Sequence, residues 1–156
     1  MTRLAQLPAY VDTNGTWEEV RDRLYGHFCG TFKCNPRRRI RGKLLVFDGR
    51  CIDSDLEEGF WHIVTRGKGA DRLLDTERAR RISWLPAMLD GSVPGLSTWV
   101  YADAKGIPRL YYWLEAEKYV VLLEKPRVVV PVTAYHVDHQ GQENDLRRRR
   151  AAGRPI

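Results

Sequence analysis

Side chains that can move protons or hold phosphate recur along this sequence. His62 lies in an apolar stretch, and Thr133 and Tyr135 alternate with apolar residues, so both share one face of an extended segment. An imidazole has an ordinary pKa of about 6.5 and suits proton transfer near neutral pH, whereas guanidinium groups stabilise negative charge that grows on a phosphoryl group. RNA carries its own nucleophile, the 2′-hydroxyl. These residue types therefore suffice to cleave RNA.

Each of these residues also has a purely structural interpretation. His62 could donate to a backbone carbonyl inside a packed core, and Thr133 with Tyr135 could form a surface pair between strands. Three further positions are open in the same way, namely Tyr111 as core or as a surface for a base, Arg109 as a ligand of RNA, and His136 as a solvated side chain or a second acid–base group.

Signatures of metal and nucleotide cofactors are missing from the sequence. It has no Gly-x-Gly-x-x-Gly motif after a strand, no Walker A loop, no His-Glu-x-x-His and no pair of Cys-x-x-Cys motifs. His27, Cys29 and Cys34 lack the paired short spacings of a zinc site, and no second acidic pattern matches Asp53 and Asp55. We therefore expect neither a metal nor a cofactor.

Charge favours a polyanionic partner. The chain of 156 residues has 26 Lys plus Arg against 20 Asp plus Glu, a net charge of +6. The excess gathers in two clusters, residues 37–43 and residues 147–154. Arginine predominates in both, and its planar guanidinium binds phosphate oxygens two at a time. The alternatives are a solvated loop for the first cluster and a disordered tail for the second.

Length and patterning predict a single domain in the cytoplasm. No run approaches the roughly 18 to 20 apolar residues that cross a bilayer, and residues 1–8 contain no apolar signal region. Three cysteines cannot all pair within one chain, which fits a reducing compartment. We expect an irregular lead-in over residues 1–15, one domain over 16–140, and a basic, disordered tail over 141–156.

The spacing of apolar residues predicts helices followed by strands. A capping box at Thr16 and Glu19 begins a helix that Gly30 ends, and its apolar stripe, which includes Trp17, should face the core. A short helix should contain His62, and another should run from Asp75 to a stop or kink at Pro86. Four strands follow, at 97–101, 109–114, 119–124 and 128–136. This order predicts an α+β fold, with helices on one face of an antiparallel sheet and part of the other face free for a ligand. Because Pro131 cannot donate to a ladder, its strand should lie at an edge or carry a bulge.

Several segments resemble small prophage-associated proteins assigned to the barnase/EndoU/colicin/RelE-like (BECR) nuclease superfamily. The segments that carry the resemblance are Gly59–Lys68, Arg78–Ile82, Trp84, Tyr112–Leu123 and Val132–Tyr135. The resemblance implies helices packed on a curved, roughly four-stranded antiparallel sheet that binds RNA on its open face.

The resemblance also implies roles for single residues. His62 becomes a general base or acid, Thr133 a hydrogen-bond partner of the scissile phosphate, and Tyr135 a proton-transfer or base-stacking group. Arg81 joins this catalytic set. Basic residues that hold the substrate complete the prediction, namely Arg66, Lys68, Arg78 and Arg80, the last standing where relatives tend to carry an acid.

Together these observations predict a metal-independent endoribonuclease of toxin type. It would cut tRNA or mRNA by attack of the 2′-hydroxyl and leave a 2′,3′-cyclic phosphate. Activity of this kind in its own cytoplasm would be toxic, so we expect a prophage or phage-defence context and an acidic antitoxin or immunity protein as partner. The alternatives are a non-catalytic module that binds RNA or DNA, and a regulator or structural phage protein.

Overall fold

A five-stranded antiparallel sheet forms the centre of the chain. The computed structural model describes residues 7–34, 37–52, 54–67, 71–124 and 128–156. The strands lie in the order β8-β7-β6-β5-β9. Their bounds are Leu96–Ala102 for β5, Pro108–Leu114 for β6, Tyr119–Glu124 for β7, Val130–His136 for β8 and Arg154–Pro155 for β9.

The first four of these strands confirm the α+β prediction and its antiparallel sheet. Each is rich in β-branched and aromatic residues, which pack well on a pleated surface. β8 lies at an edge, and its register against β7 shifts between Leu122 and Leu123, opposite Pro131 and Thr133. Both expectations for the strand containing Pro131 are therefore met. The predicted number of strands is one too few, because β9 pairs with β5 through Trp99 and Val100.

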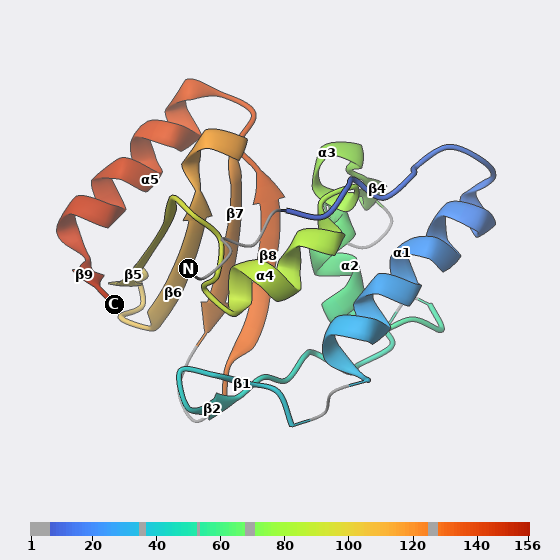
Figure 1. Cartoon of the computed structure of the whole chain (residues 1–156), viewed down its shortest axis with the longest axis horizontal. Coiled ribbons are helices and arrows are strands. Elements are labelled where there is room, and N and C mark those ends of the chain that lie inside the picture. Colours follow the sequence, from blue (N-terminus) through green and yellow to red (C-terminus); the bar gives the residue numbers. More distant parts are fainter. Residues whose placement is uncertain (1–6, 35–36, 53, 68–70, 125–127) are drawn as a thin grey trace, which may run out of the picture.

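Helices precede and follow the sheet (Figure 1). Thr16 caps α1, because its Oγ1 accepts from the amide of Glu19 at 3.2 Å, and the helix ends at Phe32, two residues beyond the predicted stop. The helices span Trp17–Phe32 for α1, Glu58–Val64 for α2, Thr76–Ala79 for α3, Leu85–Leu89 for α4 and Gln140–Ala152 for α5, with 3₁₀ turns at Ile82–Trp84 and Glu115–Glu117. Two short hairpins complete the fold, β1 (Arg39–Ile40) with β2 (Lys43–Leu44) and β3 (Thr65–Arg66) with β4 (Leu73–Leu74).

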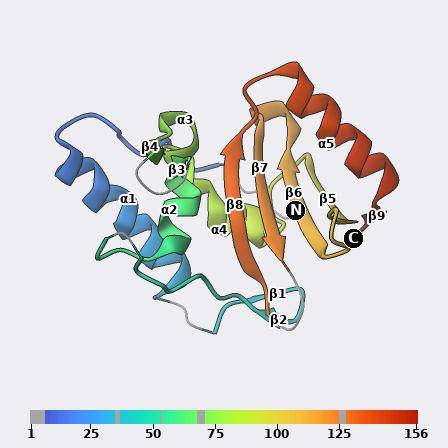
Figure 2. The same cartoon turned by 180° about the vertical axis from the view of Figure 1, so that it is seen from behind.

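Two hydrophobic cores lie on opposite faces of the sheet. The larger core joins the helices before the sheet to one face, through residues such as Phe28, Phe60 and Tyr112. The smaller core joins Leu146 of α5 to Trp99 and neighbouring residues on the other face. Figure 2 shows the sheet between the helices that precede it in the sequence and α5, which follows it.

Three expectations are corrected by this arrangement. The basic segment over 141–156 is not a disordered tail, because it forms α5 and β9. As a result α5 covers much of the sheet face that was expected to be open. Pro86 lies in the first turn of α4 and does not end a helix, which suits a residue whose missing N–H would have no helical partner there. Among the described residues, no helix has the length and apolar character needed to cross a membrane.

Candidate active site

The candidate site lies where α2 packs against the edge strand β8. Phe60, Ile63 and Val64 turn the apolar side of α2 into the core, and this leaves the side chain of His62 38% exposed. Thr133 of β8 donates its hydroxyl hydrogen to the carbonyl oxygen of His62 at 3.2 Å. The backbone of His62 therefore contacts the Thr-Ala-Tyr strand directly, and the side chains of His62 and Thr133 line one hollow.

Arg78 fixes this junction from the side of α3. Its Nη1 donates to the carbonyl oxygens of Thr65 and His62 at 2.5 and 3.4 Å, and to Thr133 Oγ1 at 3.3 Å. The side chain is only 16% exposed, and its ion pair with Asp75 is long, with 3.9 Å between Nε and the carboxylate oxygen. Burial lowers the pKa of Arg78 below its usual value, although a guanidinium stays charged in proteins. Arg78 is thus a cation held mainly by neutral oxygens.

Two adjoining hollows open on either side of Arg78. The first has a volume of about 350 Å³, and the second about 410 Å³. Arg66, Arg78 and Thr133 line both of them. His62 lines the first hollow, and His136 lines the second. A phosphodiester held at the shared residues would therefore border both hollows, one with His62 in its lining and the other with His136.

The β3–β4 hairpin positions Arg66 at the mouth of both hollows. Gly67, which follows it, has a φ of +84°, and a Cβ there would lie 2.5 Å from the backbone oxygen of Asp71. Only glycine fits this turn without a shift of the backbone. Arg66 is exposed, so its guanidinium is accessible to a ligand.

The surroundings of His62 favour the neutral imidazole. Burial lowers the pKa of His62, and the carboxylates of Glu58 and Asp48 oppose this effect only in part. Glu58 Oε2 lies 3.7 Å from His62 Nε2 and is itself held by Arg72 Nη2 at 2.7 Å. A neutral imidazole at neutral pH can accept a proton, so His62 is suited to the role of a base.

Two residues around His62 were not predicted as part of the site. The spacing of Glu58 and His62, four positions apart on one helix, was a signal that could have paired them. Arg72 had no such signal. It precedes β4, and only the folding of the β3–β4 hairpin brings it to Glu58 of α2.

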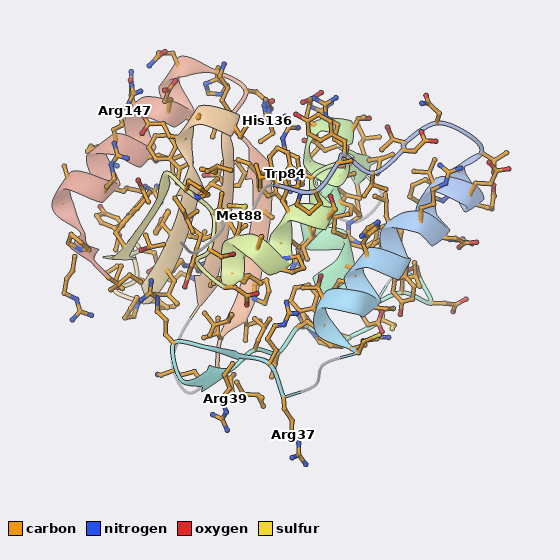
Figure 3. The ribbon with its side chains drawn as sticks, viewed as in Figure 1. Arg37, Arg39, Trp84, Met88, His136 and Arg147 are labelled. Atoms are coloured by element: carbon orange, nitrogen blue, oxygen red, sulfur yellow. The ribbon has the colours of Figure 1, made fainter. Side chains whose placement is uncertain are left out.

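The second hollow contains an imidazole that a carboxylate orients. Asp138 Oδ1 lies 2.8 Å from His136 Nδ1, so Nδ1 donates to this carboxylate, and Nε2 lies 4.0 Å from Glu77 Oε2. Figure 3 shows His136 at the end of the sheet where α5 begins. Tyr135 is half-buried in the same hollow, and burial raises its pKa to about 12. The phenol therefore stays protonated and can donate a hydrogen bond, but it is not a base.

Four predicted site residues serve the fold instead. Arg81 is 4% exposed and donates to the backbone oxygen and the carboxylate of Glu77, so the prediction that it is catalytic is not supported. Arg80 pairs with Glu77 and lies 4.2 Å from the centre of the Tyr10 ring. Neither arginine lines either hollow.

Arg109 and Tyr111 are the other two. Arg109 binds Asp103 at 3.1 Å and so secures the β5–β6 turn. Tyr111 is 1% exposed beneath α5, where Arg149 donates to its hydroxyl at 2.7 Å. Of its two interpretations, the core is therefore the correct one, because α5 covers this strand face and no base can stack there. Lys68, the last predicted ligand of phosphate, lies outside the described residues.

Comparison with known proteins adds no relative to this description. No family model, curated protein or solved structure matches the chain. Within the described part of the chain, no group of three or more His, Cys, Asp or Glu side chains could hold a metal ion. The chemistry of the site is therefore argued from its own geometry.

Proposed function

We propose that this protein is a metal-independent endoribonuclease of the BECR type. The observation that carries the proposal is the pair of hollows that share Arg66, Arg78 and Thr133 and hold one imidazole each. In-line cleavage of RNA needs a base on one side of the phosphate and an acid on the other. It also needs positive charge at the phosphate itself, which Arg66 and Arg78 supply.

The proposed reaction assigns each proton to an atom. Neutral His62 accepts the proton of the 2′-hydroxyl, and the 2′-oxygen forms a new bond to phosphorus. The bond from phosphorus to the 5′-oxygen breaks, and that oxygen takes a proton from the imidazolium of His136. The products are a 2′,3′-cyclic phosphate and a free 5′-hydroxyl.

Two further residues assist without exchanging protons. Tyr135, whose pKa of about 12 keeps it protonated, donates a hydrogen bond to a phosphoryl oxygen. Thr133 gives its hydroxyl hydrogen to the carbonyl of His62, so we assign it a positioning role instead of the phosphate contact expected from the resemblance. It keeps β8 and α2 at a fixed spacing.

A comparison of histidine variants tests the proposal. Purified protein, His62→Ala and His27→Ala are each incubated with total RNA in EDTA, and the ends of the products are analysed. His27 is exposed on α1 and lines neither hollow, so it is the matched control. We expect cyclic phosphate ends from the parent and from His27→Ala, and a loss of roughly 10²- to 10⁴-fold in His62→Ala.

The other outcomes separate the alternatives. Equal gel shifts of RNA without cleavage by any of the three proteins would favour a non-catalytic binding module. Cleavage that EDTA abolishes would contradict a metal-independent reaction. Cleavage by His62→Ala at the parental rate would remove His62 from the mechanism.

A toxin role extends the same proposal. Cleavage of cellular tRNA or mRNA would stop growth, and the net charge of +6 suits neutralisation by an acidic antitoxin or immunity protein. Induced expression of the parent in a bacterial host should therefore arrest growth, whereas His62→Ala should not. Equal growth with both proteins, at equal soluble yield, would contradict the toxin role.

A further inference from the structure

A third hollow adjoins the candidate active site on the far side of α2. It has a volume of about 500 Å³, within the range of sites that hold small organic groups. Thr65 and Arg72 line both this hollow and the one that contains His62. Because Trp61 and His62 are consecutive in α2, one short helix supplies a side chain to each hollow.

Exposed apolar side chains surround this third hollow. Trp17, the first residue of α1, is 41% exposed, and Leu73 on β4 is 59% exposed. The prediction that Trp17 faces the core is therefore wrong. Its ring stacks near that of Trp61, with centroids 6.2 Å apart and planes inclined by 23°. Exposed aromatic surface of this kind beside a charged cleft points to a ligand.

The Trp61 indole is held rigidly in place. Its Nε1 donates to Ser54 Oγ at 2.9 Å, and the guanidinium of Arg72 lies 5.8 Å from its ring centre. Ser54 Oγ also donates to the carbonyl and accepts from the amide of Leu56, so this hydroxyl has no hydrogen-bonding capacity left for a ligand. The hollow offers flat apolar surface and one guanidinium, and few free polar groups that could recognise the edge of a base by hydrogen bonds.

Charge decides on which side of the tryptophan pair a nucleic acid would lie. A further hollow beside Trp17 and Trp61 is lined by the carboxylates of Asp22 and Asp55 and by Arg21, which pairs with Asp22 at 3.4 Å, so one negative charge is left over. Carboxylates repel phosphate. The hollow that contains Arg72 has no acidic side chain among its described lining residues, and it shares Thr65 and Arg72 with the hollow that contains His62.

We infer that the hollow beside Trp17 and Trp61 binds a nucleobase of the RNA next to the scissile phosphate. The inference rests on the proposed function, which places that phosphate at Arg78. Stacking on an indole tolerates every base, since each has a π face. The subsite therefore adds affinity with little preference for sequence, and it requires a single-stranded substrate whose bases are unstacked.

The test uses a short single-stranded RNA with 2′-O-methyl riboses, which cannot be cleaved by 2′-hydroxyl attack. One base at a time is replaced by an abasic unit, and binding to the full-length protein is measured. We expect one position at which loss of the base weakens binding roughly 5- to 100-fold. In Trp17→Ala the intact RNA should bind more weakly by a similar factor, and the abasic penalty at that position should disappear.

Matched variants guard the result against misfolding. Trp17→Phe keeps a stacking ring and should retain most of the penalty. Leu73→Asp changes an exposed side chain and places a negative charge in the hollow, so it should weaken binding without affecting the fold. Tyr10→Ala removes a similarly exposed ring, 46% exposed, that does not line this hollow, and it should bind like the parent.

Parallel cleavage of the same sequence as unmodified RNA separates the two proposals. If the abasic penalty depends on Trp17 but the parent does not cleave RNA, the base subsite stands and the catalytic proposal fails. If the parent cleaves RNA but the penalty is unchanged in Trp17→Ala, the subsite inference alone is overturned. The exposed rings would then be free for a protein partner.

Discussion

The arginines of α5 and two arginines of the cleft between α2 and β8, Arg66 and Arg78, differ in what they bind, whereas the third cleft arginine, Arg72, pairs with Glu58. Four consecutive arginines on α5 form the most basic run in the sequence, yet each of them forms an ion pair with a carboxylate. The pairs are Arg147 with Glu115 and Glu143, Arg148 and Arg149 with Asp145, and Arg150 with Glu115. Figure 3 shows Arg147 on the outer side of α5. The charge of this run is largely balanced within the fold.

The cleft arginines are scattered in the sequence and converge only in the structure. Arg78 is held mainly by carbonyl and hydroxyl oxygens, which orient a guanidinium without cancelling its charge. Arg66 is exposed and has no ion pair with any described residue. A run of basic letters is thus a poor guide to a phosphate site, and the chemistry of each arginine's partners is a better one.

The largest expected effect comes from Arg78→Ala compared with Arg148→Ala. Both variants lose one positive charge, so any general effect of net charge is the same. Arg78→Ala should lower kcat/KM for RNA at least 100-fold, because a buried cation at the phosphate is lost. Arg148 is 62% exposed and should be dispensable. Initial rates with one labelled RNA measure both variants.

The stability of Arg78→Ala and Arg148→Ala must be measured alongside their activity. Arg78 bridges α3, α2 and β8, so its removal should also destabilise the fold by about 1 to 3 kcal/mol. Rates are therefore taken below the unfolding transition of each variant. Similar losses of activity in Arg78→Ala and Arg148→Ala would show that total charge matters and that the cleft does not.

Gly153→Ala tests the other half of the comparison. A Cβ at Gly153 would lie 2.6 Å from the carbonyl oxygen of Val100 and 2.8 Å from Trp99 Cδ1. The contact should loosen β9 and the end of α5, and lower the free energy of unfolding by about 1 to 3 kcal/mol. Urea unfolding followed by tryptophan fluorescence measures the change.

A helix glycine in open space is the control for this substitution. Gly26 has no neighbour within 4 Å of its Cβ position, so Gly26→Ala should raise stability by roughly 0.5 to 1 kcal/mol. Below the unfolding transition, Gly153→Ala should cleave RNA at the parental rate. Loss of activity in the folded variant would mean that α5 takes part in catalysis.

Much of the fold could be predicted because the decisive signals are local. The cap at Thr16 and the β-branched runs locate α1 and the four main strands within one or two residues. The end of the chain could not be predicted in this way. Only Leu146 of α5 is buried, so its docking depends on contacts with Trp113 and Tyr111 that are distant in sequence.

The candidate site was predictable in part for the same reason. Packing of β8 against α2 brings Thr133, Arg78 and the backbone of His62 together. Arg81 was misassigned because α3 ends at Ala79, so Arg81, which caps the following 3₁₀ turn, does not continue the helix face that contains Arg78. Trp17 was misassigned because the helical period includes it in the apolar stripe, although the first turn of α1 projects beyond the core.

The pH profile of cleavage tests whether His62 acts as the base. Burial lowers its pKa, so the acid limb of the rate profile should lie below about pH 6.5, with a fall of up to tenfold per pH unit as the imidazole becomes protonated. Because the unfolded chain binds this proton more readily than the folded chain, stability should also fall as the pH drops below about 6.5 and through the lower pKa of the folded state. The urea midpoint of the parent should therefore fall relative to that of His62→Gln between about pH 7 and pH 5. An acid limb with its midpoint above pH 7 would exclude His62 as the base.

The smallest expected effect is on the salt dependence of RNA binding, which tests the comparison of the two groups of arginines directly. Each phosphate contact with single-stranded RNA contributes about −0.7 to the slope of log K against log salt. Arg66→Ala should reduce the magnitude of that slope by about this amount, because the exposed guanidinium faces the shared hollows and displaces counterions on binding. Arg148→Ala should leave the slope nearly unchanged, since Asp145 already neutralises that arginine in the free protein. Equal slopes for the two variants would mean that RNA contacts α5 as closely as it contacts the cleft.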